Sequence, residues 1–167
     1  MKKNFILVSL VAALGIFSSF SALSYDGIIK FRGTILENGC TINSGRDQEV
    51  NFGKIPKEKI IGGVGTVVSS RSFTINLTNC PGSDIGIEFA GKTDTNDTTL
   101  YNSGVNGIGI LLAKDDGAKI NANTSVNGYS ISSKNVNIPL IAKLQLTNAT
   151  VNHGDINSDV KFTLIYP

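Results

Sequence analysis

The sequence has little charge of either sign and only one histidine. Its 167 residues include 15 lysines and arginines, 13 aspartates and glutamates, and His153. There are no basic runs with interleaved aromatic residues, so nothing in the charge pattern supports nucleic-acid binding. No GxSxG motif or paired-carboxylate cleft is recognisable, and His153 is flanked by turn residues. We therefore expect no enzymatic activity, no cofactor and no metal site.

Long apolar runs are absent except at the N-terminus. Lys2 and Lys3 precede an apolar stretch over residues 5–17, and the small-x-small tripeptide Ala22-Leu23-Ser24 follows it. This order predicts a signal peptide over residues 1–24. The alternative, a retained membrane anchor, is disfavoured because the apolar stretch is short for a bilayer span. We expect export through the periplasm and a mature chain that forms one domain without a membrane span.

Cysteine is scarce as well, and its two positions favour a structural role. Cys40 and Cys80 form an even pair without CxxC spacing. In an oxidising compartment such a pair is most simply a disulfide. Closing a loop of about 40 residues contributes roughly 4 kcal/mol through the unfolded state. A redox or metal role would require closer spacing or additional histidine ligands.

The rest of the chain consists of short segments in which apolar and polar residues alternate, separated by Gly-, Asn- and Pro-containing turns. No window shows sustained helical periodicity, so the pattern predicts an all-β sandwich. The turn at Lys114-Asp115-Asp116-Gly117 predicts a hairpin. The expected strands cover residues 73–77, 85–89, 107–112, 138–146 and 162–166.

Two further segments raise the question of strand pairing. Residues 27–35 place Ile29, Phe31, Gly33 and Ile35 on one face of an expected strand, with Lys30, Arg32 and Thr34 on the other. This strand either begins the domain or pairs with another sheet. The last expected strand, residues 162–166, is followed only by Pro167, so its outer edge has no later partner. Because an open apolar edge promotes aggregation, we expect another segment to cover it.

These features together resemble the subunits of chaperone–usher fimbriae, close to the type 1 fimbrial family. The resemblance spans nearly all of the mature chain and includes the cysteine spacing, the penultimate Tyr166 and Gly154, the fourteenth residue from the end. The terminal Pro167 departs from the polar residues usual in the family. The matching segments are residues 27–35, 38–42, 50–53, 73–80, 87–91, 107–110 and 162–166.

The resemblance implies an incomplete immunoglobulin-like β-sandwich that lacks its last strand and is completed by a donor strand from another subunit or a chaperone. The implied organisation is a signal peptide (1–24), a donor-strand extension (25–36) and a pilin domain (37–167). The implied partners are a periplasmic pilus chaperone, an outer-membrane usher and neighbouring fimbrial subunits. The implied function is that of a structural subunit of an adhesive fimbria at the bacterial cell surface.

The resemblance also implies roles for particular residues. Gly33 is expected where the groove of the neighbouring subunit is too shallow for a side chain, although a simple bulge or twist is the alternative. The implied donor-strand residues are Gly27, Ile29, Phe31, Gly33 and Ile35. The implied residues of the acceptor groove and C-terminal strand are Gly154, Phe162, Leu164 and Tyr166.

Two alternative functions remain at this stage. A tip adhesin of this family carries a separate receptor domain before the pilin domain, for which this chain has no room. A self-contained secreted sandwich would instead use residues 25–36 as an ordinary strand of its own. Overall similarity slightly favours a minor adaptor over the major rod subunit, and it identifies neither the neighbouring subunits nor the receptor.

Overall fold

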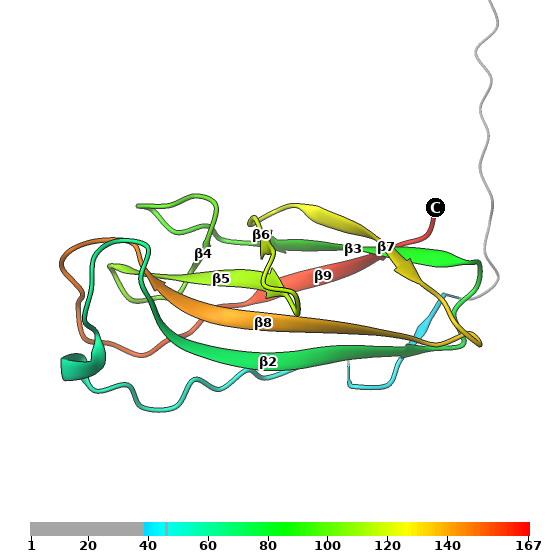
Figure 1. Cartoon of the computed structure of the whole chain (residues 1–167), viewed down its shortest axis with the longest axis horizontal. Helices are drawn as coiled ribbons and strands as arrows, with labels where there is room; N and C mark the ends of the chain where they lie inside the picture. The colour runs from blue at the N-terminus through cyan, green and yellow to red at the C-terminus, as the bar shows by residue number, and fades with distance from the viewer. Residues whose placement is uncertain (1–38, 46) are drawn as a thin grey trace, which may run out of the picture. The chain divides into compact units, whose positions relative to one another are not determined.

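Two antiparallel sheets form the part of the chain that the structure, a computed structural model, describes: residues 39–45 and 47–167 (Figure 1). The expected signal peptide and donor strand lie outside these residues and stay predictions. The elements are β1 (Thr41–Ile42), η1 (Lys57–Lys59), β2 (Val67–Thr78), β3 (Asp84–Gly91), β4 (Tyr101–Asn102), β5 (Ile108–Lys114), β6 (Lys119–Ile120), β7 (Ser125–Ser130), β8 (Val136–Leu146) and β9 (Val160–Ile165).

The larger sheet has the strand order β1-β2-β8-β5-β4, with β6 also paired to β5. Its long central strand, β8, alternates between buried and more exposed residues along its length. The inward-facing members include Ile138, which pairs with Ile75 of β2, and Leu140, which pairs with Phe73. This period of two confirms the strand predicted over residues 138–146, because only one face of the sheet contacts the core.

The smaller sheet has the order β7-β3-β9, and Phe89 of β3 pairs with Phe162 of β9. The sequence did not indicate β7, which is mostly polar and exposed. Its pairing with β3 shifts register between Ile85 and Ile87, and Gly128 in β7 has φ +86°. The sequence of β7 has no apolar alternation that would favour a strand. The strand forms because β3 provides its hydrogen-bonding partner.

The core lies between the two sheets, and both cysteines of the disulfide pack in it or against it. Fully buried side chains from both sheets include Ile85 and Ile87 of β3 together with Ile138 of β8. Cys40, just before β1, is bonded to Cys80, just after β2, which confirms the predicted disulfide. Among the residues described, no helix has the length and apolar character needed to cross a membrane.

Candidate functional site

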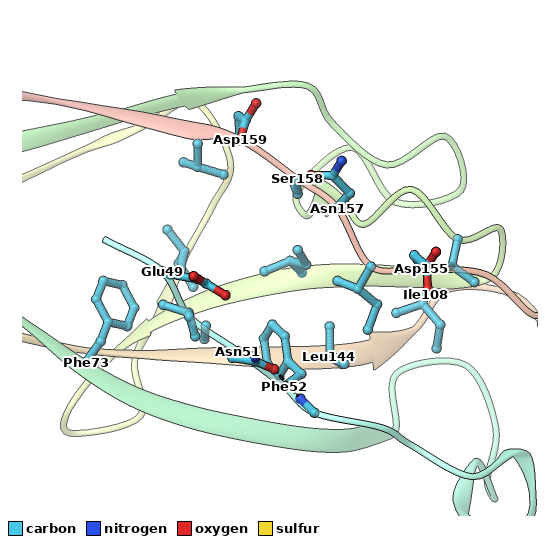
Figure 2. A pocket seen from close by; sticks show the side chains of 18 of the residues that line it. Glu49, Asn51, Phe52, Phe73, Ile108, Leu144, Asp155, Asn157, Ser158 and Asp159 are labelled. Carbon is cyan, nitrogen blue, oxygen red and sulfur yellow. Dashed lines mark hydrogen bonds between the residues drawn. The ribbon is translucent and has the colours of Figure 1, made fainter. Parts of the chain in front are cut away.

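A long groove runs along the side of the domain between two walls that are not paired with each other (Figure 2). Its volume is about 1620 Å³. Residues 47–55, between β1 and η1, form the first wall. Residues 151–163, which lead into β9 and include four of its six residues, form the second wall. The groove therefore lies where a further strand would complete the sandwich.

The floor of the groove is the hydrophobic core itself. Figure 2 shows Phe52 and Leu144 pointing into the space between the walls. Phe73, Val160 and Phe162 pack against this core but remain only partly buried, because the groove leaves one side of each uncovered. The buried floor residues are Ile75, Phe89, Ile108, Ile110, Leu112, Ala142 and Leu144. An apolar occupant of this groove would remove the partly buried side chains from water, which stabilises the bound state.

The first wall has the alternation of a strand without being part of a sheet. Val50 is half-buried and Phe52 is buried, whereas Glu49 and Asn51 between them are exposed. The structure assigns no strand to residues 47–55, so no ladder of backbone hydrogen bonds joins this wall to the neighbouring β2. Something else must hold this wall in place.

Arg71 of β2 provides that attachment. Its Nε donates a hydrogen bond to the carbonyl oxygen of Asn51 at 3.2 Å, and its Nη2 donates one to that of Phe52 at 3.1 Å. Its Nη1 donates to the carbonyl oxygen of Ser70 at 2.8 Å, which fixes the guanidinium against its own strand. The planar fork of arginine suits this task, because it carries several donors in one rigid group. No local pattern in the sequence marks Arg71, because its two acceptors lie 20 and 19 residues earlier in the chain.

The second wall is attached through backbone hydrogen bonds to the loop between β4 and β5. The amide of Asn152 donates to the carbonyl oxygen of Asn106 at 3.1 Å, and that of Asn157 donates to Ser103 at 2.9 Å. Ser103 is fully buried, and its hydroxyl bonds to backbone groups of Val105 in the same loop and to the carbonyl oxygen of Ile108, the first residue of β5. The wall that leads into β9 is therefore anchored to the ordered core of the domain.

The edge of β9 beside the groove has no strand partner among the residues that the structure describes. β9 pairs with β3 on one side only. In a strand, backbone N–H and C=O groups point alternately to the two sides, so part of those in β9 face away from β3. An unpaired row of this kind is a template for another strand.

The predicted acceptor residues occupy different places in this arrangement. Gly154 and Phe162 line the groove, while Leu164 is half-buried against the core and pairs with Ile87. Tyr166 lies near the disulfide, where its hydroxyl accepts a hydrogen bond from the amide of Cys40 at 2.7 Å. Tyr166 lines a separate, smaller pocket of about 270 Å³ that shares no lining residue with the groove. The acceptor role of these residues stays a prediction.

The carboxylates of the polar loop after β3 have a structural role. Asp94 is buried and accepts hydrogen bonds from the amides of Asn96 and Asp97. Asp97 accepts hydrogen bonds from the hydroxyl and the amide of Thr99, and the hydroxyl bond is the main cause that lowers the pKa of Asp97. Both side chains thus stabilise a turn, and neither lines the groove.

An apolar groove beside an unpaired strand edge defines the class of the fold, which is an incomplete β-sandwich. The sequence matches the Fimbrial protein family over residues 29–167. It is 30% identical over 175 residues to long polar fimbria protein A of Salmonella typhimurium strain LT2, and the match covers 99% of this chain and 97% of that protein.

Solved structures show the same fold. A type I fimbria protein and antigen of Burkholderia pseudomallei matches with a TM-score of 0.62 and 27% identity, over 78% of this chain and 91% of that chain. The P pilus rod subunit PapA matches with a TM-score of 0.67 and 18% identity, over 78% of this chain and all of that chain (100%).

The chain belongs to the Fimbrial protein family, and it is a fimbrial subunit. Its domain is an immunoglobulin-like β-sandwich that lacks the last strand, which confirms the fold class predicted from the sequence. The matched relatives are structural subunits of fimbriae.

Proposed function

We propose that the groove accepts a strand from another molecule and that residues 25–36 of a subunit provide this strand to the next subunit in the fimbria. The observation that carries the proposal is the open, apolar groove beside the unpaired edge of β9. An extended peptide placed there gains main-chain hydrogen bonds along the edge and apolar contacts below it. This mode of binding forms a polymer without making a covalent bond, so the function is structural.

The sequence of residues 25–36 suits such a groove. Ile29, Phe31 and Ile35 share one face of the expected strand. Burial of each side chain contributes roughly 1.5 to 3 kcal/mol, before the cost of ordering the segment is subtracted. Gly33 lies on the same face and allows the backbones to approach closely where the floor is shallow.

The open groove also explains why a subunit would need a helper before assembly. An exposed apolar groove with an unpaired edge is an aggregation hazard in a free subunit. In our proposal a periplasmic pilus chaperone covers the groove with a strand of its own after export. The N-terminal segment of the next subunit replaces that strand at an outer-membrane usher, and the product is an adhesive fimbria on the cell surface.

Deletion of residues 25–36 tests this proposal. The purified mature chain should form polymers visible by electron microscopy, and the deletion variant should not. A synthetic peptide of residues 25–36 should bind the deletion variant and raise its melting temperature. If the mature chain is instead a stable monomer and the deletion variant unfolds even with added peptide, residues 25–36 belong to the chain's own sandwich and the proposal is wrong.

A further inference from the structure

The smaller sheet has a second edge, formed by β7 on the side of β3 opposite β9. Among the residues that the structure describes, β7 pairs with β3 alone. Part of its backbone N–H and C=O groups therefore faces away from the sheet, as in β9. Open edges of this kind are places where another strand can add. A subunit with two open edges on one sheet would join its neighbours sideways as well as along a fibre.

The two sides of β3 differ in the regularity of their pairing. Toward β9, six consecutive residues of β3 pair one to one in unbroken register. Toward β7, Ile85 pairs with Tyr129. The next pair on that side joins Ile87 to Val126. A single residue of β3 therefore lies opposite residues 127–128 of β7, and this two-against-one arrangement is a β-bulge.

Both strands contribute to the bulge. Gly128 has φ +86°, a backbone conformation that glycine adopts without steric cost. The side chain of Asn127 lies over Gly86, the single residue opposite the bulge. A Cβ atom added to Gly86 would lie 3.2 Å from Cγ of Asn127 and 3.3 Å from the carbonyl oxygen of Val126, and it would meet Oδ1 of Asn127 more closely still. A glycine inside a strand often marks such a bulge or close approach, and Gly86 is explained in this way.

The bulge divides the β7 edge into short pieces. β7 contains six residues, and the bulge separates residues 125–126 from residues 129–130. A bulge also bends its strand and increases the local twist, so the two pieces do not form one straight row of hydrogen-bonding groups. β9, in contrast, pairs with β3 over its whole length without a shift. A strand added beside β7 would therefore find only short runs of consecutive pairs.

We infer that the bulge at residues 127–128 closes the β7 edge to a further strand, so that the smaller sheet accepts an added strand only beside β9. The inference rests on the proposed function and deepens it. With one edge open and the opposite edge blocked, strand addition builds single fibres instead of lateral aggregates. Bulges are one of the means by which native sheets prevent edge-to-edge pairing. Here the device includes Gly86 of the central strand and is not a property of the edge strand alone.

Two variants of the mature chain test the inference, and they differ only in the bulge. The first combines Asn127→Thr with deletion of Gly128, which leaves one residue opposite Gly86. Val126 and Tyr129 are partly buried against the core, and after the deletion they are two positions apart, so strand alternation keeps both on that face. The control carries Asn127→Thr and keeps Gly128. Circular dichroism and urea unfolding check that both variants fold.

Electron microscopy and hydrogen exchange measure the outcome. Wild type and the control should form separate fibres, in which the amides of residues 125–130 exchange as they do in the dilute chain. The deletion variant should form bundled or branched fibres, and exchange at residues 125–130 should slow about tenfold or more because the outward amides gain partners. If the deletion variant folds and its fibres and exchange match those of the control, the bulge does not close the edge and the inference is wrong.

Wild type alone provides a second test, which decides the matter if the deletion variant does not fold. Slowed exchange at residues 125–130 in wild-type fibres would mean that β7 pairs with another strand, and it would overturn the inference. Unchanged exchange there, together with slowed exchange at residues 160–165 of β9, is the expected result.

Exchange at β9 also separates this inference from the function on which it rests. If wild type forms no fibres and exchange at residues 160–165 never slows, the proposed strand insertion is wrong. The β7 edge is then judged from the oligomeric state of the two variants in analytical ultracentrifugation. The deletion variant should associate and the control should not, and equal behaviour of the two would refute the role of the bulge.

Discussion

Replacement of Arg71 should loosen the first wall of the groove and weaken strand binding. In Arg71→Gln the hydrogen bonds to the carbonyl oxygens of Asn51 and Phe52 are lost. Each hydrogen bond contributes about 0.5 to 1.5 kcal/mol. We take the lower part of this range because Arg71 is exposed, which gives about 1 to 2 kcal/mol for the pair. Affinity for a peptide of residues 25–36 should therefore fall roughly 5- to 30-fold.

The matched control for this prediction is Lys143→Gln. Lys143 lies on the neighbouring strand β8, where it pairs with Ser70, and it does not line the groove. The two variants lose the same charge from the same sheet, so they differ only in the attachment of the wall. Isothermal titration calorimetry with the peptide measures affinity, and urea unfolding measures stability. If Arg71→Gln and Lys143→Gln show the same affinity and stability, the wall does not depend on Arg71.

Four further substitutions test the contacts described above and the proposed donor strand. Cys80→Ser should lower the free energy of unfolding by roughly 4 kcal/mol, measured in urea, and an unchanged value would contradict the role of the disulfide. Tyr166→Phe removes the acceptor for the Cys40 amide and should cost about 1 kcal/mol in the same assay, with wild-type stability as the opposing outcome. Gly33→Leu should block polymer formation seen by electron microscopy while leaving the groove able to bind the natural peptide, and normal polymer yield would count against the donor role. Folding lowers the pKa of Asp97 below its ordinary value of 3.8. The ionised carboxylate therefore stabilises the fold above pH 3.8, and this contribution is lost as the pH falls through the folded-state pKa. The free energy of unfolding in urea should consequently depend less on acid pH in Asp97→Asn than in wild type.

Local sequence patterns predicted the main strands because one face of each strand is buried. The alternation in β2 and β8 is visible in the sequence, since inward residues such as Ile75 and Ile138 must be apolar. The hairpin predicted at residues 114–117 is confirmed, because this turn joins β5 to β6. The sequence did not define the two-residue strands β4 and β6 themselves, because two residues carry no periodicity. The polar β7 was not predicted, because its strand conformation depends on pairing with β3 and not on apolar alternation in its own sequence.

The candidate site was only partly predictable. The sequence indicated that the last strand would have an open edge and that the matching N-terminal segment was apolar on one face. It did not indicate that residues 47–55 form the opposite wall, because Val50 and Phe52 are too few to define a strand. Nor did it show that Tyr166 would contact the Cys40 amide, which lies 126 residues away in the sequence.

By itself, the sequence determined the all-β class, the disulfide and the family, because periodicity, cysteine spacing and motif order are properties of the chain. The tertiary structure alone decided the shape of the groove and the attachment of its first wall by Arg71. Each of these depends on residues that are distant in sequence and meet only when the two sheets pack, so no local pattern can encode them.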